Sequence, residues 1–120
     1  MSKAEIRPSA DAARPAALFA ALGDPTRLAL LAALAAGEER SIAILSIETR
    51  RRAGVALSRQ ALTKHLDVMT RAGLLKQRRV GRESRFQVRP EAVADARAYL
   101  DRVSAQWDEA LGRLKAFVEQ

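Results

Sequence analysis

The arginine and lysine side chains of this chain are concentrated in its middle third. Residues 50–89 contain twelve Lys/Arg and two acids, a net charge of +10, whereas the other residues contain nine bases and twelve acids, a net charge of −3. A solvated surface normally mixes its signs, so a long stretch of nearly one sign indicates a polyanionic partner. Nucleic acid is the polyanion that best fits such a pattern, and double-stranded DNA is the partner we expect.

Within this basic stretch, one predicted helix carries polar side chains that can read base edges. Residues 59–72 place apolar side chains at helical spacing, with Ser58 as an N-cap and Gly73 as a terminator. The opposite face is polar and consists of Ser58, Arg59, Gln60, Thr63, Lys64 and Asp67. Arg and Gln make two-pronged contacts to guanine and adenine in a major groove, and free amides at a helix start attract phosphate. A capped surface helix without any such role fits the same pattern.

Two short strands are predicted directly after this helix, over residues 74–80 and 84–88, with residues 80–83 as a hairpin turn. Four arginines gather around Gly81 in that turn: Arg78, Arg79, Arg82 and Arg85. A two-stranded ribbon with four arginines is poor as a core element and suits contact with a DNA backbone or a narrow minor groove. A helix-turn-helix followed directly by a basic hairpin is a winged helix, which is the fold that the sequence predicts.

The elements that must position these side chains are mainly helical. Ala and Leu, both strong helix formers, supply much of the 48% hydrophobic content. The first helix is predicted from near Pro15 to Leu22, the second opens at Asp24 and Pro25, and a third opens at Ser41. The buried side of the second helix is expected to consist of Leu28, Leu31, Ala32 and Ala35, with Leu30 and Leu34 adjoining.

Together these elements predict a fold that is mostly α with a small β-hairpin, an α+β winged helix-turn-helix. We expect residues 1–10 to form a flexible N-terminal arm and residues 11–120 to form a single DNA-binding domain. The stretch around residues 49–55, after the third helix begins, is left open. Its three arginines either add phosphate contacts or lie in a solvated loop: Arg50, Arg51 and Arg52.

The last helix, about residues 90–118, carries a seam of apolar side chains in alternating steps of 3 and 4. The seam consists of Val93, Ala96, Leu100, Val103, Trp107, Ala110, Leu114 and Phe117, and Tyr99 and Leu111 widen it. The helix would be about 42 Å long, which exceeds what one small domain needs to cover its own core. We therefore predict a homodimer rather than a helix that packs only on its own domain. The expected interface is Leu18, Phe19, Leu22, Leu100, Val103, Trp107, Leu111 and Leu114.

Composition excludes several classes of protein and site. The chain has no Cys, which excludes disulfides, thiolate metal sites and a cysteine nucleophile. Its single histidine, His65, is expected to be a hydrogen-bonded residue between the apolar and polar faces of its helix rather than a metal ligand or a base. No paired carboxylates, phosphate loop or metal cluster stands out, so we expect neither an enzyme nor a cofactor. No apolar run is long enough to span a membrane and no secretory signal is evident, so a cytoplasmic location without membrane contact is expected.

Three segments, in this order and spacing, resemble the ArsR-type (ArsR/SmtB) winged-helix repressors over residues 18–88. They are Leu22-Gly23-Asp24-Pro25-Thr26-Arg27-Leu28, Ser58-Arg59-Gln60-Ala61-Leu62-Thr63-Lys64-His65-Leu66 and Arg71-Ala72-Gly73-Leu74-Leu75. The resemblance implies a homodimeric transcriptional repressor that binds an operator palindrome. It also implies groove contacts by Ser58, Arg59, Gln60, Thr63 and Lys64, and wing contacts by Arg79, Arg82 and Arg85.

The sequence departs from the family pattern in two ways. Metal-sensing members place cysteines before the recognition helix and use His and acidic ligands in the last helix, whereas this chain has no Cys and no His after residue 65. We therefore predict a member of the family without its cysteine metal site. In addition, Ser41 and Ser58 are further apart than the family pattern indicates, and the surplus falls around residues 49–55.

We thus expect a sequence-specific regulator, a homodimeric repressor on an inverted-repeat operator. The alternative is an architectural protein that coats nucleic acid without reading its sequence. The sequence leaves open whether an effector releases the DNA.

Overall fold

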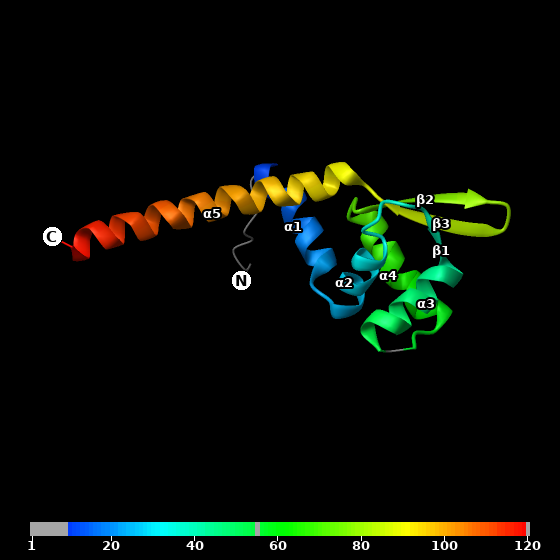
Figure 1. The fold of residues 1–120 in the computed structure, drawn as a ribbon. Helices are drawn as coiled ribbons and strands as arrows, with labels where there is room; N and C mark the ends of the chain where they lie inside the picture. Colours follow the sequence, from blue (N-terminus) through cyan, green and yellow to red (C-terminus); the bar gives the residue numbers. More distant parts are fainter. Residues whose placement is uncertain (1–9, 55, 120) are drawn as a thin grey trace, which may run out of the picture.

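The computed structural model describes residues 10–54 and 56–119 (Figure 1). The elements follow in the order α1 (Ala10–Leu22), α2 (Pro25–Ala33), β1 (Arg40–Ser41), α3 (Ile42–Ala53), α4 (Arg59–Arg71), β2 (Leu75–Val80), β3 (Glu83–Val88) and α5 (Pro90–Val118). This is the predicted α+β winged helix-turn-helix, with α3 and α4 as its two-helix unit and β2 and β3 as its wing. Of the expected arm, residues 1–9 lie outside the described residues, and Ala10 is already helical.

Three side chains start their helices where the sequence predicts. The Asp24 carboxylate accepts a hydrogen bond from the Arg27 amide at 3.1 Å, and Pro25 occupies the first turn of α2. The Ser41 hydroxyl accepts from the Ile44 amide at 3.3 Å, and the Ser58 hydroxyl accepts from the Ala61 amide at 3.1 Å. Each cap satisfies an amide that the first helical turn leaves without a partner, so the starts of α2, α3 and α4 are fixed locally.

Helix α1 begins earlier than expected. Pro15 was placed near the first turn, but α1 starts at Ala10 and Pro15 lies inside it. A proline removes one amide from the helical ladder, and that cost falls on a single turn. The alanine-rich sequence before and after Pro15 favours the helical conformation strongly enough for the helix to continue past the proline.

The predicted buried face of α2 is wrong. Leu28 is 52% exposed and Ala32 and Ala35 are exposed as well, whereas Leu30, Ala33 and Leu34 are buried and Leu31 is half-buried. Leucines occur on more than one side of this nine-residue helix, so two different faces fit the helical period. Packing against α1, α3 and α4 selects the face, and the sequence of α2 alone does not contain that information.

Helix α3 is longer than the sequence indicated. It continues through three arginines to Ala53 and ends at Gly54, whose φ of 69° is the left-handed conformation that glycine adopts without strain. The solvated-loop reading of Arg50, Arg51 and Arg52 is therefore wrong, because these residues form the last turn of α3. Cations at this end of a helix interact favourably with its dipole.

Within the described residues, three strands form an antiparallel sheet in the order β1-β3-β2. The wing closes with Val80 opposite Glu83, so Gly81 and Arg82 make a two-residue turn, and Gly81 has a φ of 63°. Strand β1 was not predicted. Its two residues are too few to show any periodicity, and they become a strand only because β3 pairs with them.

The core lies between α1, α2, α3, α4 and the base of the wing. Its fully buried side chains come from all of these elements: Leu18, Leu30, Leu34, Leu45, Leu62, Leu66, Met69, Leu74 and Leu75. Leu18, expected at the dimer interface, is instead 0% exposed in the core of its own chain, where its side chain has no surface left for a partner.

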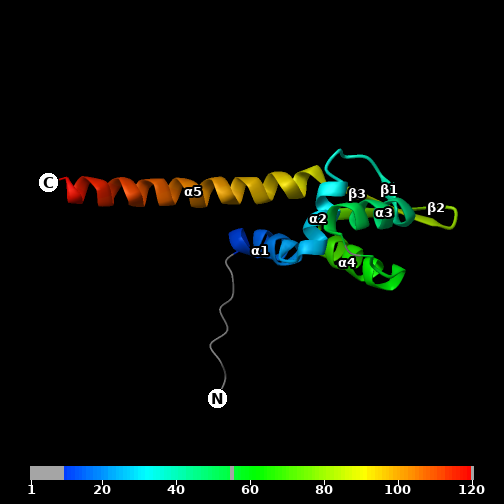
Figure 2. The ribbon, with the colours of Figure 1, turned by 60° about the horizontal axis from the view of Figure 1, so that its bottom comes forward.

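Helix α5 packs on α1 at its start and then leaves the body of the molecule (Figures 1 and 2). The radius of gyration is 18.6 Å and the extents are 66 × 40 × 26 Å. A compact domain of this length has a radius of gyration of about 14 Å. The excess comes from α5, most of which lies beside no other part of the chain. Among the described residues, no single helix is long and apolar enough to cross a membrane.

Candidate nucleic-acid interface

Helix α4 presents one apolar and one polar face, as predicted. Leu62, Leu66 and Met69 are buried in the core. The five side chains predicted to face DNA are all exposed: Ser58, Arg59, Gln60, Thr63 and Lys64. They border one open hollow of about 730 Å³ at the start of the helix, together with Ala61. The structure therefore brings these five residues together on a single surface.

Thr63 has its hydrogen-bonding role partly fixed. Its hydroxyl donates to the Arg59 carbonyl at 2.7 Å, so its only proton is engaged within the helix. Toward a base edge, Thr63 can still accept a hydrogen bond or present its methyl group to thymine. Arg59, Gln60 and Lys64 carry no such internal side-chain bond among the described residues.

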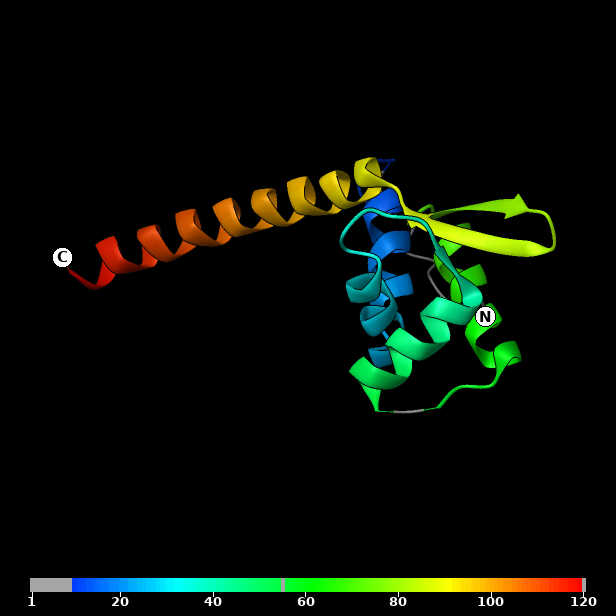
Figure 3. The ribbon, with the colours of Figure 1, turned by 45° about the vertical axis from the view of Figure 1, so that its right-hand side comes forward.

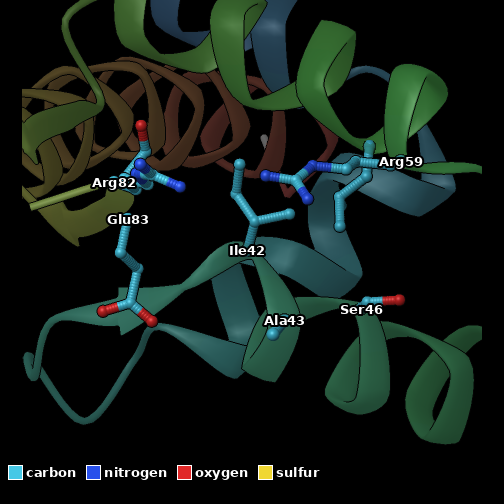
Figure 4. A pocket seen from close by; sticks show the side chains of 8 residues that line it. Ile42, Ala43, Ser46, Arg59, Arg82 and Glu83 are labelled. Atoms are coloured by element: carbon cyan, nitrogen blue, oxygen red, sulfur yellow. The ribbon is translucent and has the colours of Figure 1, made fainter.

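A groove of about 490 Å³ joins the recognition helix α4 to the wing (Figure 4). Its walls are Ile42, Ala43 and Ser46 from α3, Arg59 and Leu62 from α4, and Arg82, Glu83 and Ser84 from the wing. The guanidinium groups of Arg59 and Arg82 extend into it from opposite sides (Figure 4). Neither is ion-paired to a carboxylate within the part of the chain that the structure describes. Two cations facing one groove create a positive potential that suits a phosphate backbone.

The same arrangement is visible at the level of whole elements. The tip of the wing and the start of α4 lie toward one side of the molecule, and α5 extends toward the other (Figures 2 and 3). The recognition helix and the arginine-bearing hairpin thus share one exposed surface, at the end of the molecule that α5 leaves free.

The four wing arginines fall into two pairs that the sequence did not separate. Arg78 and Arg85 are direct cross-strand partners and therefore share one face of the hairpin. Arg79 lies on the other face of the hairpin, where Ser84 is its cross-strand partner. Arg82 occupies the turn. Ser84, which shares the face of Arg79, lines the groove beside α4.

Carboxylates compensate the first pair. The Arg78 guanidinium donates two short hydrogen bonds to Glu39, with Nη2–Oε1 at 2.7 Å and Nε–Oε2 at 2.8 Å, and Arg85 pairs with Glu83 at 2.9 Å. The hydrogen bond from Arg78 lowers the pKa of the Glu39 carboxyl, and the same contact raises the pKa of Arg78. Sequence reasoning missed Glu39 because it lies 39 residues from its partner. Arg79 and Arg82 have no carboxylate at ion-pair distance in residues 10–54 and 56–119.

His65 lies on α4 at the boundary between the two faces and is half-buried. Its Nδ1 is 3.2 Å from Nη1 of Arg27, and because a guanidinium can only donate, Nδ1 accepts. Arg27 also donates through Nε to the carbonyl of Ala21, and Asp24 Oδ2 lies 3.9 Å from His65 Nδ1. The hydrogen bond from the backbone amide of Arg27 lowers the pKa of Asp24, and the positive charge of the Arg27 side chain adds to this effect. This cluster ties the end of α1 and the start of α2 to the recognition helix, as expected for a hydrogen-bonded boundary residue.

Apolar side chains remain uncovered along α5. Leu100, Trp107, Leu111 and Leu114 are 53%, 64%, 56% and 57% exposed, while Val103 is half-buried. On α1, Phe19 and Leu22 are half-buried, and the Phe19 ring lies 5.9 Å from that of Tyr99 on α5. Phe117 near the end of α5 is 74% exposed. Seven of the eight residues expected at a dimer interface thus retain accessible surface, and Leu18 is the exception.

Comparisons with known proteins agree with this architecture. A family model described as a helix-turn-helix domain matches residues 22–78. The chain is 38% identical over 66 residues to YuzN of Bacillus subtilis (strain 168), an uncharacterized HTH-type transcriptional regulator. The matched residues cover 55% of this chain and 72% of YuzN.

Solved structures give the same picture. An ArsR-like transcriptional regulator from Rhodococcus sp. RHA1 superimposes with a TM-score of 0.69 at 33% identity, over 88% of this chain and 92% of that one. The homodimeric winged helix-turn-helix DNA-binding domain of Mb0332 from Mycobacterium bovis, a possible ArsR-family regulator, has a TM-score of 0.61 at 24% identity, over 88% and 92% of the two chains. Because the Bacillus and Rhodococcus proteins are 38% and 33% identical to this chain, over 72% and 92% of their own lengths, the chain belongs to the ArsR-type family of helix-turn-helix transcriptional regulators.

Proposed function

We propose that this protein is a homodimeric, sequence-specific repressor that occupies an inverted-repeat operator. The observation that carries the proposal is the shared groove into which Arg59 of the recognition helix and Arg82 of the wing both extend. A helix that enters the major groove needs a flanking contact to the backbone that fixes its depth and register, and the wing provides it.

Within this proposal the exposed side chains divide into two roles. Arg59 and Gln60 make two-pronged contacts to base edges, and Thr63, Lys64 and Ser58 complete the contact surface of α4. Arg79 and Arg82 bind the backbone or the adjacent minor groove. Because Glu39 and Glu83 compensate Arg78 and Arg85, we assign that pair to holding the wing in place.

The seam of α5 supports pairing of two chains. A helix of 29 residues is about 43 Å long, and most of its apolar side chains are exposed in the single chain. The homodimeric state of the Mycobacterium bovis domain of the same fold agrees with this role. A two-fold axis near α5 would repeat the recognition helix, and two half-sites about 34 Å apart form an inverted repeat. Occupancy of such a site blocks a promoter, and a DNA-bound regulator of this kind works in the cytoplasm.

Selection of bound duplexes from a random-sequence library tests this proposal. We expect the purified protein to enrich an inverted repeat whose half-sites are about 10 base pairs apart. A promoter that carries the enriched site should lose expression when the protein is produced beside it. A library that shows no enrichment, with equal affinity for selected and random duplexes, would instead identify a non-sequence-specific architectural protein.

A further inference from the structure

The last turn of α3 contains three arginines, and Arg50 differs from the other two in its surroundings. Ala43, Ser46, Ile47 and Arg50 follow one another at steps of 3, 1 and 3 and therefore lie on one face of the helix. All four are exposed, with Ile47 63% exposed. This face is the only part of α3 that reaches both hollows described below.

The first hollow is the groove between α4 and the wing, which Ala43 and Ser46 line (Figure 4). The second hollow, of about 210 Å³, is lined by Ser46, Ile47, Arg50, Ala56 and Leu57. Ser46 lines both, so the two hollows are neighbours along α3. Arg50 stands at the end of this surface that is remote from the wing.

The second hollow also touches the start of the recognition helix. Ala56 and Leu57 directly precede the N-cap Ser58, so Arg50 lies beside the residues that lead into α4. In Figures 1 and 3 the start of α4 lies between the wing and the end of α3. Arg82 therefore borders the hollow beside α4, and Arg50 borders the hollow beside the residues that lead into α4.

The two neighbours of Arg50 are differently placed. Arg51 and Arg52 approach the Glu48 carboxylate at 3.9 Å and 3.8 Å. Arg50 has no carboxylate at ion-pair distance within the described ranges 10–54 and 56–119. Arg50, Arg51 and Arg52 all lie in the last turn of α3, where the helix dipole favours a cation, so the dipole alone does not set Arg50 apart from its neighbours.

We propose that Arg50 is a further DNA contact, which binds a phosphate of the strand that the wing does not reach. A helix in a major groove about 12 Å wide has a phosphate backbone on each side, and the wing can hold only one of them. In this proposal the second backbone passes beside the residues that lead into α4, where Arg50 borders the second hollow. This inference rests on the proposed function, since it requires α4 to enter the groove.

The test compares Arg50→Ala with Arg51→Ala, which removes the same charge from the same helical turn. Fluorescence anisotropy at several salt concentrations gives the Kd for the selected operator and for a scrambled duplex. We expect Arg50→Ala to weaken both by a similar factor, on the order of tenfold, and to lower the slope of log K against log salt by about 2, one per protomer. Arg51→Ala should keep the wild-type slope, and Arg50→Lys should restore it.

A wild-type slope for Arg50→Ala, or equal losses in Arg50→Ala and Arg51→Ala, would overturn the inference. The outcome separates the two proposals. If the wild-type protein lacks operator preference while Arg50→Ala still lowers the slope, the proposed function fails and the phosphate contact stands. If operator preference is present and Arg50→Ala keeps the slope, only the phosphate contact fails.

Discussion

Replacement of Trp107 by alanine should separate the dimer while leaving each chain folded. The C-terminal half of α5 extends beyond the body of the molecule (Figure 2). Trp107 belongs to this half by its position in the sequence, and its side chain is 64% exposed. Because a tryptophan side chain buries about 150–250 Å², its exposed part is on the order of 100–150 Å². At about 25 cal/mol/Å², covering that area contributes about 3 kcal/mol per protomer.

Alanine keeps only a small part of this area, so Trp107→Ala should cost about 2 kcal/mol per protomer and about 4 kcal/mol per dimer. The dimer Kd should therefore rise by about three orders of magnitude. Sedimentation equilibrium over a range of protein concentrations measures this constant. Asp108→Ala, one residue further along α5 and outside the seam, is the matched control and should leave the Kd unchanged.

The thermal midpoint of the Trp107→Ala monomer tests whether the effect is confined to association. Trp107 lies outside the buried core, so the fold of a single chain should not depend on it. An unchanged dimer Kd in Trp107→Ala, or a wild-type protein that remains monomeric at all concentrations, would refute the assignment of the seam to dimerisation.

Two further predictions concern the stability of the chain. Leu66 is 0% exposed on the core side of α4, so Leu66→Ala should lower the free energy of unfolding by about 2–5 kcal/mol, as measured by urea denaturation; a loss under about 1 kcal/mol would contradict the core position. The pKa of Asp24 is lowered in the folded chain from its usual 3.8, so its carboxylate stabilises the fold above that pH, and this contribution is lost as the pH falls through the lowered pKa. The stability difference between wild type and Asp24→Ala should therefore be present at neutral pH and shrink in acid, whereas a difference independent of pH would show that the ionised carboxylate is not its source.

Local chemistry made much of this fold predictable from sequence. The Ser58 hydroxyl caps its helix by accepting a hydrogen bond from the amide three residues further along the chain. A helix start of this kind is therefore predictable from a few neighbouring residues. The polar face of α4, the wing turn at Gly81 and the seam of α5 depend in the same way on short spacings.

The features that sequence reasoning missed depend on partners far along the chain. β1 exists because β3 pairs with it, and the buried face of α2 is set by three neighbouring helices. The division of the wing arginines depends on Glu39, which no spacing pattern connects to Arg78. Leu18 fits an interface stripe as well as a core stripe, and only the packing of α1 decides between them.

The assignment of α4 and the wing as the DNA-binding surface is tested most directly by one competition titration. The selected operator and a scrambled duplex compete for binding to the wild-type protein, to Arg59→Ala and to Arg82→Ala at a single salt concentration. We predict that Arg59→Ala loses about 1–3 kcal/mol at the operator and relaxes the base preference at one position, because it removes a contact to a base edge. Arg82→Ala should weaken both duplexes evenly, because it removes a contact to the backbone. An Arg59→Ala protein that keeps the full wild-type preference for the operator would contradict the assignment of α4 as the recognition helix.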